Sequence, residues 1–261
     1  MSPSTPNRIK RLKAGMKLRG IDVPICFKPE ISFYLTTFNP TIYSHPTIGS
    51  GLALTLRGRL GKTRSRTFRH RGGVVRLQRV LPNASFSYVG KLYQERQSIE
   101  DEDEIANART AAELCNAGTA AAEISLIGAG TEQDAVRAAW TAMYDLWARK
   151  YPNHIINGFG SLEGGNFYSL KPWVLYEHRR FLQIDKPSAD SIRDEAVAVL
   201  IWVGTNCMHA ELERTVCVSD FSGAQRDALE RVEVIRAETP AMLKPGSRRP
   251  RATIHQRTHS H

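Results

Sequence analysis

The sequence predicts an α+β protein with a helical segment near its middle and a disordered basic tail at its end. Helical spacing of apolar residues dominates between about residues 98 and 150, whereas short β-branched and aromatic runs bounded by Pro, Gly and Asn occur on both sides. With 261 residues, 41% of them hydrophobic, the chain can bury one large core or two small ones. We expect a basic N-terminal arm over 1–20, an α+β region over 21–238 with the helical insertion at about 98–150, and a tail over 239–261.

Three of the expected strands lie before residue 94. The run "ISFYLTTF" (31–38) is β-branched and aromatic, and Asn and Pro close it. The apolar pattern of residues 48–60 does not distinguish a strand from a short helix, and we favour a helix. Residues 72–82 and 84–93 alternate in strand fashion around a turn at 82–83, which predicts a basic hairpin.

Two helices are expected next. Residues 104–126 are Ala-rich, and they predict a helix despite Gly118. Residues 131–151 predict a second helix, which begins with Thr131 and Asp134 at capping-box spacing. One stripe of this second helix, expected to face the core, consists of Val136, Trp140, Met143 and Trp147.

Four glycines fall within eight residues between two strand-like runs, at positions 158, 160, 164 and 165. Such a loop suits a close approach of an anion to the backbone, and a plain hairpin turn is the alternative interpretation. After the loop we expect a helix over 188–203, a strand over 214–219, a helix over 222–235 and disorder from about residue 239.

The charge distribution indicates a polyanionic partner. The formal net charge is +10 and the pI is about 9.7. No acid occurs from residue 31 to 94, and the stretch 53–82 holds nine Lys or Arg. An acidic run, "ERQSIEDEDE", follows, and the chain closes on a second basic segment. Such segregation favours nucleic acid as the partner; the alternatives are a merely solvated basic surface and a basic segment that the acidic run neutralises internally.

Other classes of protein fit less well. The sequence around Gly61, Lys62 and Thr63 imitates a nucleotide-binding loop, but Leu56 stands where that motif needs glycine. The four cysteines form no C-x-x-C pair, so we expect buried thiols, no metal and no disulfide scaffold. No apolar run is long enough to cross a membrane and no secretion signal is evident, which predicts a cytoplasmic protein without a membrane partner.

The strand "ISFYLTTFNP", the loop "TIYSHPTIGSGL" with one histidine, the basic hairpin and the later "GFGSLEGGNFYSLKPW" together resemble the RAMP superfamily of CRISPR-associated RNA-binding proteins. Within it the chain is most similar to the endonucleases that process repeat RNA. The resemblance implies ferredoxin-like modules, a glycine-rich loop that contacts RNA, and catalysis by a histidine after the first strand. It also implies a CRISPR transcript or guide RNA as partner, together with other subunits of an effector complex in antiviral defence.

The chemistry implied is metal-independent and cofactor-free, because a ribose 2′-OH can attack the neighbouring phosphate and leave a 2′,3′-cyclic phosphate. His45 would move the proton, Tyr43 and Ser44 would position the 2′-OH, and His70 is the competing histidine. An arginine-only site is also admissible. The residues expected to bind RNA are Arg57, Arg59, Lys62, Arg64, Arg66, Arg69, Arg71, Arg76, Arg79, Gly158, Gly160, Gly164, Gly165 and Lys171.

Two alternatives to the endoribonuclease stay open at this stage. One is a noncatalytic RNA-binding subunit of a CRISPR effector complex. The other is an unrelated nucleic-acid-binding structural protein.

Overall fold

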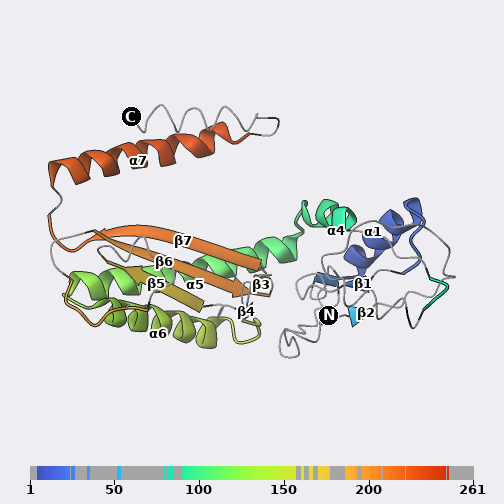
Figure 1. The fold of residues 1–261 in the computed structure, drawn as a ribbon, viewed down its shortest axis with the longest axis horizontal. Helices are drawn as coiled ribbons and strands as arrows, with labels where there is room; N and C mark the ends of the chain where they lie inside the picture. The colour runs from blue at the N-terminus through green and yellow to red at the C-terminus, as the bar shows by residue number, and fades with distance from the viewer. Residues whose placement is uncertain are drawn as a thin grey trace.

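A computed structural model gives the fold, and it contains two bodies of elements joined by one long helix (Figure 1). The structure describes residues 5–23, 25–26, 34–35, 52–53, 79, 81–84, 90–156, 160–161, 165–166, 170–176, 186–192, 196–206, 208–220, 222–244 and 246. The elements in order are α1 (Thr5–Leu18), β1 (Ile25–Cys26), β2 (Leu52–Ala53), α4 (Gly90–Gln97), α5 (Glu102–Ile127), α6 (Glu132–Lys150), β3 (Gly160–Ser161), β4 (Gly165–Asn166), β5 (Leu170–Leu175), β6 (Ala196–Thr205), β7 (Met208–Cys217) and α7 (Gly223–Met242).

The larger body is a two-layer α/β arrangement. Strands β5, β6 and β7 form an antiparallel sheet in that order, and α5 and α6 pack together against one face of it. Side chains in β6 alternate, so that Val197, Val199, Ile201 and Val203 are fully buried against the helices. This alternation places the core of the body between the sheet and the helix pair.

Helices α5 and α6 begin at capping boxes. The Asp101 carboxylate accepts the backbone N–H of Glu104, whose side chain accepts the N–H of Asp101 in return. Thr131 and Asp134 exchange the same pair of bonds at the start of α6, as their spacing predicts. These reciprocal bonds satisfy N–H groups that no carbonyl within the helix can reach, and they fix the first residue of each helix.

Gly118 lies where α5 approaches α6 and β6. A Cβ atom at this position would lie 2.9 Å from Cδ1 of Ile201 and 2.9 Å from Cγ and Sδ of Met143. Carbon atoms in packed interiors rest about 3.5–4.0 Å apart, so glycine is what allows the three elements to meet so closely. Glycine costs a helix about 1 kcal/mol relative to alanine, and the close packing offsets that cost here.

A buried carboxylate ties α6 to the sheet. Glu132 is 1% exposed, and it accepts the backbone N–H of Tyr176 at 2.7 Å and that of Ser188 at 2.5 Å. Tyr176 directly follows β5, and Ser188 belongs to the segment that leads toward β6. One side chain at the N-terminus of α6 therefore satisfies two backbone donors in the connection between β5 and β6.

The smaller body contains α1 and α4, and an ion pair attaches it to α5. Leu12 and Met16 of α1 pack with Leu92 and other buried residues. Arg8, only 5% exposed, donates two 2.6 Å hydrogen bonds to the two oxygens of Asp101. Because Asp101 is also the N-cap of α5, one carboxylate both begins the long helix and holds α1 to it.

Several expected elements are confirmed. The helices expected over 104–126 and 131–151 are α5 and α6, and the helix expected over 222–235 is α7. The turn expected at 82–83 is present, with Ala84 N–H donating to the carbonyl of Leu81. The strand expected over 214–219 is part of β7, which begins six residues earlier. Within the α6 stripe Val136 and Met143 are buried, but Trp140 is 43% exposed.

Other expected elements were wrong. The segment expected to form a helix over 188–203 contributes instead the strand β6, because its Val and Ile residues alternate into the core. Tyr34 and Leu35, expected in a strand, are helical and buried. Leu52–Ala53 is a short strand instead of a helix, and Arg79 is helical instead of extended. From Gly90 onward, the residues expected in the second strand of the basic hairpin form the helix α4 instead.

The ferredoxin-like fold expected from the RAMP resemblance is also corrected. A βαββαβ module alternates helices with strands, whereas α5 and α6 follow each other directly and the sheet after them is a meander of sequential strands. The proposed domain division stays a prediction, although α1 occupies most of the basic arm and α7 continues past residue 239. None of the helices in the described residues is long and apolar enough to span a membrane.

Candidate functional site

Most residues expected to form an RNA site lie outside the described part of the chain. This holds for His45, Tyr43, Ser44, His70, Arg57, Arg59, Lys62, Arg64, Arg66, Arg69, Arg71, Arg76, Gly158 and Gly164. Among the others, Arg79 is an exposed helical residue and Lys171 lies in β5. Gly160 and Gly165 lie in the antiparallel β3–β4 pair, as the plain-hairpin interpretation expects.

The second face of the β5–β6–β7 sheet carries the candidate site. Residues directly opposite each other in antiparallel strands share a face. The register places Lys171, Trp202 and Glu211 in one row across the sheet, and Trp173, Leu200 and Glu213 in the next. Because α5 and α6 cover the other face, these six side chains project away from the helices. We refer to them as the Trp face.

Two tryptophans form the centre of the Trp face. The ring centroids of Trp173 and Trp202 lie 4.6 Å apart with the planes at 86°, an edge-to-face contact. Lys171 places its ammonium nitrogen 4.3 Å from the centroid of the Trp173 ring, within the range of a cation–π interaction. Both tryptophans are half-buried, so each ring keeps part of its surface accessible.

The face is electrically asymmetric. Glu211 and Glu213 are exposed on β7, and Lys171 is half-buried on β5 at the other edge. Burial lowers the pKa of Lys171 from its ordinary value. Strands lie about 4.8 Å apart, so about 10 Å separates the basic edge from the acidic edge, with tryptophan between them. Such an arrangement suits a short ligand that carries an amine at one end and a carboxylate at the other.

The described residues do not fit a metal centre. Within them, no group of three or more His, Cys, Asp or Glu side chains is placed to hold a metal ion. Cys207 lies outside those residues, and the Cys217 thiol donates to the carbonyl of Ser219. Cys115 is the buried thiol that the sequence predicts, whereas Cys217 is half-buried. Burial raises the pKa of Cys115 to about 12, so this thiol is not a nucleophile near neutral pH.

Sequence reasoning missed the Trp face, apart from Lys171. A signal was present in "LKPWVL" and "HAELERT", where polar or aromatic residues alternate with apolar ones. The helix predicted over 188–203 hid the same alternation in β6. Once that segment is a strand, Trp202 must lie on the face opposite Ile201 and Val203.

Comparison with known proteins identifies the fold. No protein family and no curated protein matches the sequence. Among known structures, the chain is similar to the prolidase from Thermococcus sibiricus, with 15% identity and a TM-score of 0.62 over 92% of this chain and 72% of that one. The prolidase from Pyrococcus horikoshii has 16% identity and a TM-score of 0.60 over 89% of this chain and 71% of that one. The Xaa-Pro dipeptidase from Bacillus anthracis has 14% identity and a TM-score of 0.52 over 91% of this chain and 71% of that one.

These likenesses overturn the RAMP resemblance drawn from the sequence. The structural neighbours are prolidases and related X-Pro peptidases, and no CRISPR-associated protein is among those described above. The predictions that depended on this resemblance are therefore wrong as well: the processing of CRISPR RNA, the guide-RNA partner and the effector subunits. The error came from reading a histidine loop, a basic segment and a glycine-rich loop as one pattern, although local composition does not specify how strands are connected. At 14–16% identity, what the comparisons establish is that this chain has a fold like that of the prolidases.

Proposed function

We propose that the chain binds short proline-containing peptides on the Trp face. The observation that carries this proposal is the Trp173–Trp202 pair, set between a lysine and a glutamate on a prolidase-like fold. Aromatic-lined surfaces are a recurrent means of recognising proline, whose rigid ring loses little conformational freedom on binding. The names of the structural neighbours supply the same ligand class independently.

The geometry suits a peptide of two or three residues that lies across the strands. An extended dipeptide spans about 7 Å, so its charged ends can approach both edges of a face about 10 Å wide. The amine would lie toward Glu211, the carboxylate toward Lys171, and the proline ring over Trp202. Charge at both edges would fix the direction of the peptide as well as its length.

Binding of Ala-Pro to the full chain, measured by isothermal titration calorimetry, tests the proposal. We expect Ala-Pro to bind more tightly than Ala-Ala, and acetylation of its amine to weaken binding about tenfold through the lost charged contact. Trp202→Ala should abolish the preference for proline, whereas Tyr144→Ala, at an exposed position on α6, should leave it unchanged. Equal affinity for Ala-Pro and Ala-Ala would refute recognition of proline on this face.

Hydrolysis of Xaa-Pro peptides is the second candidate function, favoured by the names of the neighbouring structures. Aminopeptidases of many kinds cleave the peptide bond with bound metal ions, and the described residues present no cluster suited to hold one. We therefore assign no catalytic step to them. Release of free proline from Ala-Pro, assayed with and without added Mn²⁺, separates cleavage from binding alone.

A further inference from the structure

Helix α7 is largely exposed along its length. None of its residues is buried, and no helix or strand in the described part of the chain packs extensively against it. Figure 1 shows it standing apart from the α5–α6 layer. Helices in proteins gain most of their stability from packing an apolar stripe against another element, which directs attention to the stripe that α7 carries.

That stripe has the spacing of a coiled-coil seam. Its members recur at intervals of four, three, four and three residues, and they are Ala228, Val232, Ile235, Thr239 and Met242. We refer to these residues as the α7 seam. Val232 is 49% exposed, and Ile235, Thr239 and Met242 are half-buried. Positions that alternate three and four apart form one continuous stripe, which packs efficiently against a second helix of the same kind.

We propose that α7 is a self-association surface, on which α7 of a second copy of this chain packs in antiparallel orientation. The charges beside the seam select the orientation. When Val232 lies opposite Ile235 of the partner subunit, Arg231 lies opposite Glu238 of the partner subunit, and the twofold axis repeats this attraction. In a parallel pair, Arg231 would lie opposite Arg236 of the partner subunit, so like charges would meet.

Two other occupants fit the seam less well. A membrane-surface helix carries an excess of Lys and Arg on its polar face, whereas α7 has three arginines against four acids. The chain's own C-terminal segment, 247–261, contains only Ala252 and Ile254 as apolar residues, too few to cover the seam. A second copy supplies both an identical apolar seam and the complementary charges.

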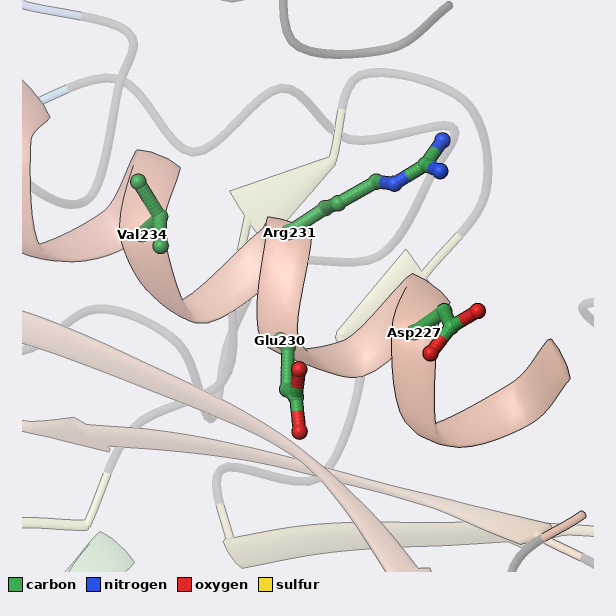
Figure 2. Close-up of a pocket in the computed structure, with 4 residues that line it drawn as sticks. All are labelled: Asp227, Glu230, Arg231 and Val234. Atoms are coloured by element: carbon green, nitrogen blue, oxygen red, sulfur yellow. The ribbon is translucent and has the colours of Figure 1, made fainter. Parts of the chain in front are cut away.

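The depression along α7 is distinct from this seam. Its volume is about 350 Å³, and its described lining residues are Asp227, Glu230, Arg231 and Val234. Figure 2 shows Arg231 and Glu230 projecting from opposite sides of the helix. Val234 is two residues from Val232, about 200° around the helix, so it lies off the seam. The two valines, 47% and 49% exposed, therefore provide a matched pair for testing it.

Sedimentation equilibrium of the full chain over a range of concentrations tests the proposal. A 20-residue helix is about 30 Å long, so the contact is small and we expect a dimer that dissociates at micromolar concentration. Val232→Asp should raise the dissociation constant at least about 100-fold, because two carboxylates would have to lose water in the interface. Val234→Asp should change it less than about threefold. A protein that stays monomeric at every concentration, or equal effects of the two substitutions, would overturn the proposal.

Charge reversal tests the orientation without touching the seam. Arg231→Glu alone and Glu238→Arg alone should each weaken self-association about tenfold or more, since both attractive pairs become repulsive. The two variants mixed together should form a heterodimer, and the double reversal in one chain should restore self-association. Circular dichroism verifies that each variant keeps its helix content, and a helical mixture that does not associate would refute the antiparallel pairing. A dimer indifferent to all these changes, or one lost on deletion of 247–261, would place the interface elsewhere and refute it too.

Discussion

Asp101 is the single side chain whose loss should most disturb how the two bodies are joined. It begins α5 as the N-cap and receives both hydrogen bonds of the buried Arg8 guanidinium. Asp101→Asn separates these two roles. An asparagine can still accept the N–H of Glu104 as a cap, but it no longer neutralises Arg8.

The expected magnitude follows from burial. Breaking a buried ion pair by removal of one partner costs about 3–5 kcal/mol. Arg8 is 5% exposed, but Asp101 keeps 18% and Arg8 also donates to the carbonyl of Tyr34 at 3.2 Å, so we take the lower end, about 3 kcal/mol. Asp101→Ala removes the cap as well and should cost about 1 kcal/mol more. Glu102→Ala removes an exposed carboxylate from the same turn and should cost about 0.5 kcal/mol or less.

Acid should have the same effect as Asp101→Asn. The hydrogen bond from Arg8 holds the pKa of Asp101 below its ordinary value, so the stabilisation is present above about pH 4 and is lost as the pH falls through the lowered pKa. Burial raises the pKa of Glu104 and therefore acts in the opposite direction. The part of the acid destabilisation that comes from protonation of Asp101 should be absent in Asp101→Asn.

Urea unfolding followed by circular dichroism measures the free energy, and hydrogen exchange of the α1 amides shows whether the small body opens separately. A double-mutant cycle with Arg8→Met isolates the pair, and we expect a coupling of about 2 kcal/mol or more. If Asp101→Asn and Glu102→Ala destabilise the protein equally, the ion pair is not what holds α1 to α5.

Two further predictions concern buried ionisable groups of the larger body. Glu132→Gln should lower the free energy of unfolding by about 2 kcal/mol, because the new amide NH₂ would face a backbone N–H from which the carboxylate now accepts. Glu230→Gln, on exposed α7, is the control and should change that free energy by less than about 0.5 kcal/mol in the same urea titration. Burial raises the pKa of Cys115 to about 12 in the folded protein. Above about pH 8.5 the thiol therefore ionises in unfolded chains while it stays protonated in folded ones, and this difference favours unfolding. Stability should therefore fall by about 1.4 kcal/mol per unit from about pH 8.5 toward pH 12, and Cys115→Ala should lack that slope.

The helices were predictable where their signals are local. The capping boxes at Asp101 and Thr131 depend on residues three positions apart, and only the second was recognised from sequence, because the first lies inside a run of acids that was interpreted by its charge. Gly118 weakened the prediction of α5 without invalidating it. A glycine is needed at this position for a tertiary reason, since it makes room for Met143 and Ile201.

The sheet was less predictable because its evidence is not local. Residues 196–205 are apolar enough for a buried helix or a buried strand, and only pairing with β5 and β7 decides between them. The Trp face depends on that pairing, which brings Lys171, Trp202 and Glu211 together from three strands. Net charge directed the functional prediction toward RNA, and the RAMP resemblance that made this RNA a CRISPR transcript was wrong, because net charge carries no information on the fold.

The order of elements in the larger body has a consequence for how it folds. The hairpin of α5 and α6 forms between neighbours in sequence, and so do the β5–β6 and β6–β7 pairs. The docking of α5 onto β6 and β7, and of α6 onto β5, joins segments that are farther apart in the sequence. Local pairing of this kind favours rapid formation of the helical hairpin and of the meander, because little loop-closure entropy is lost before their contacts form. The rate-limiting event should then be the arrival of the completed meander on a helical hairpin that is already assembled.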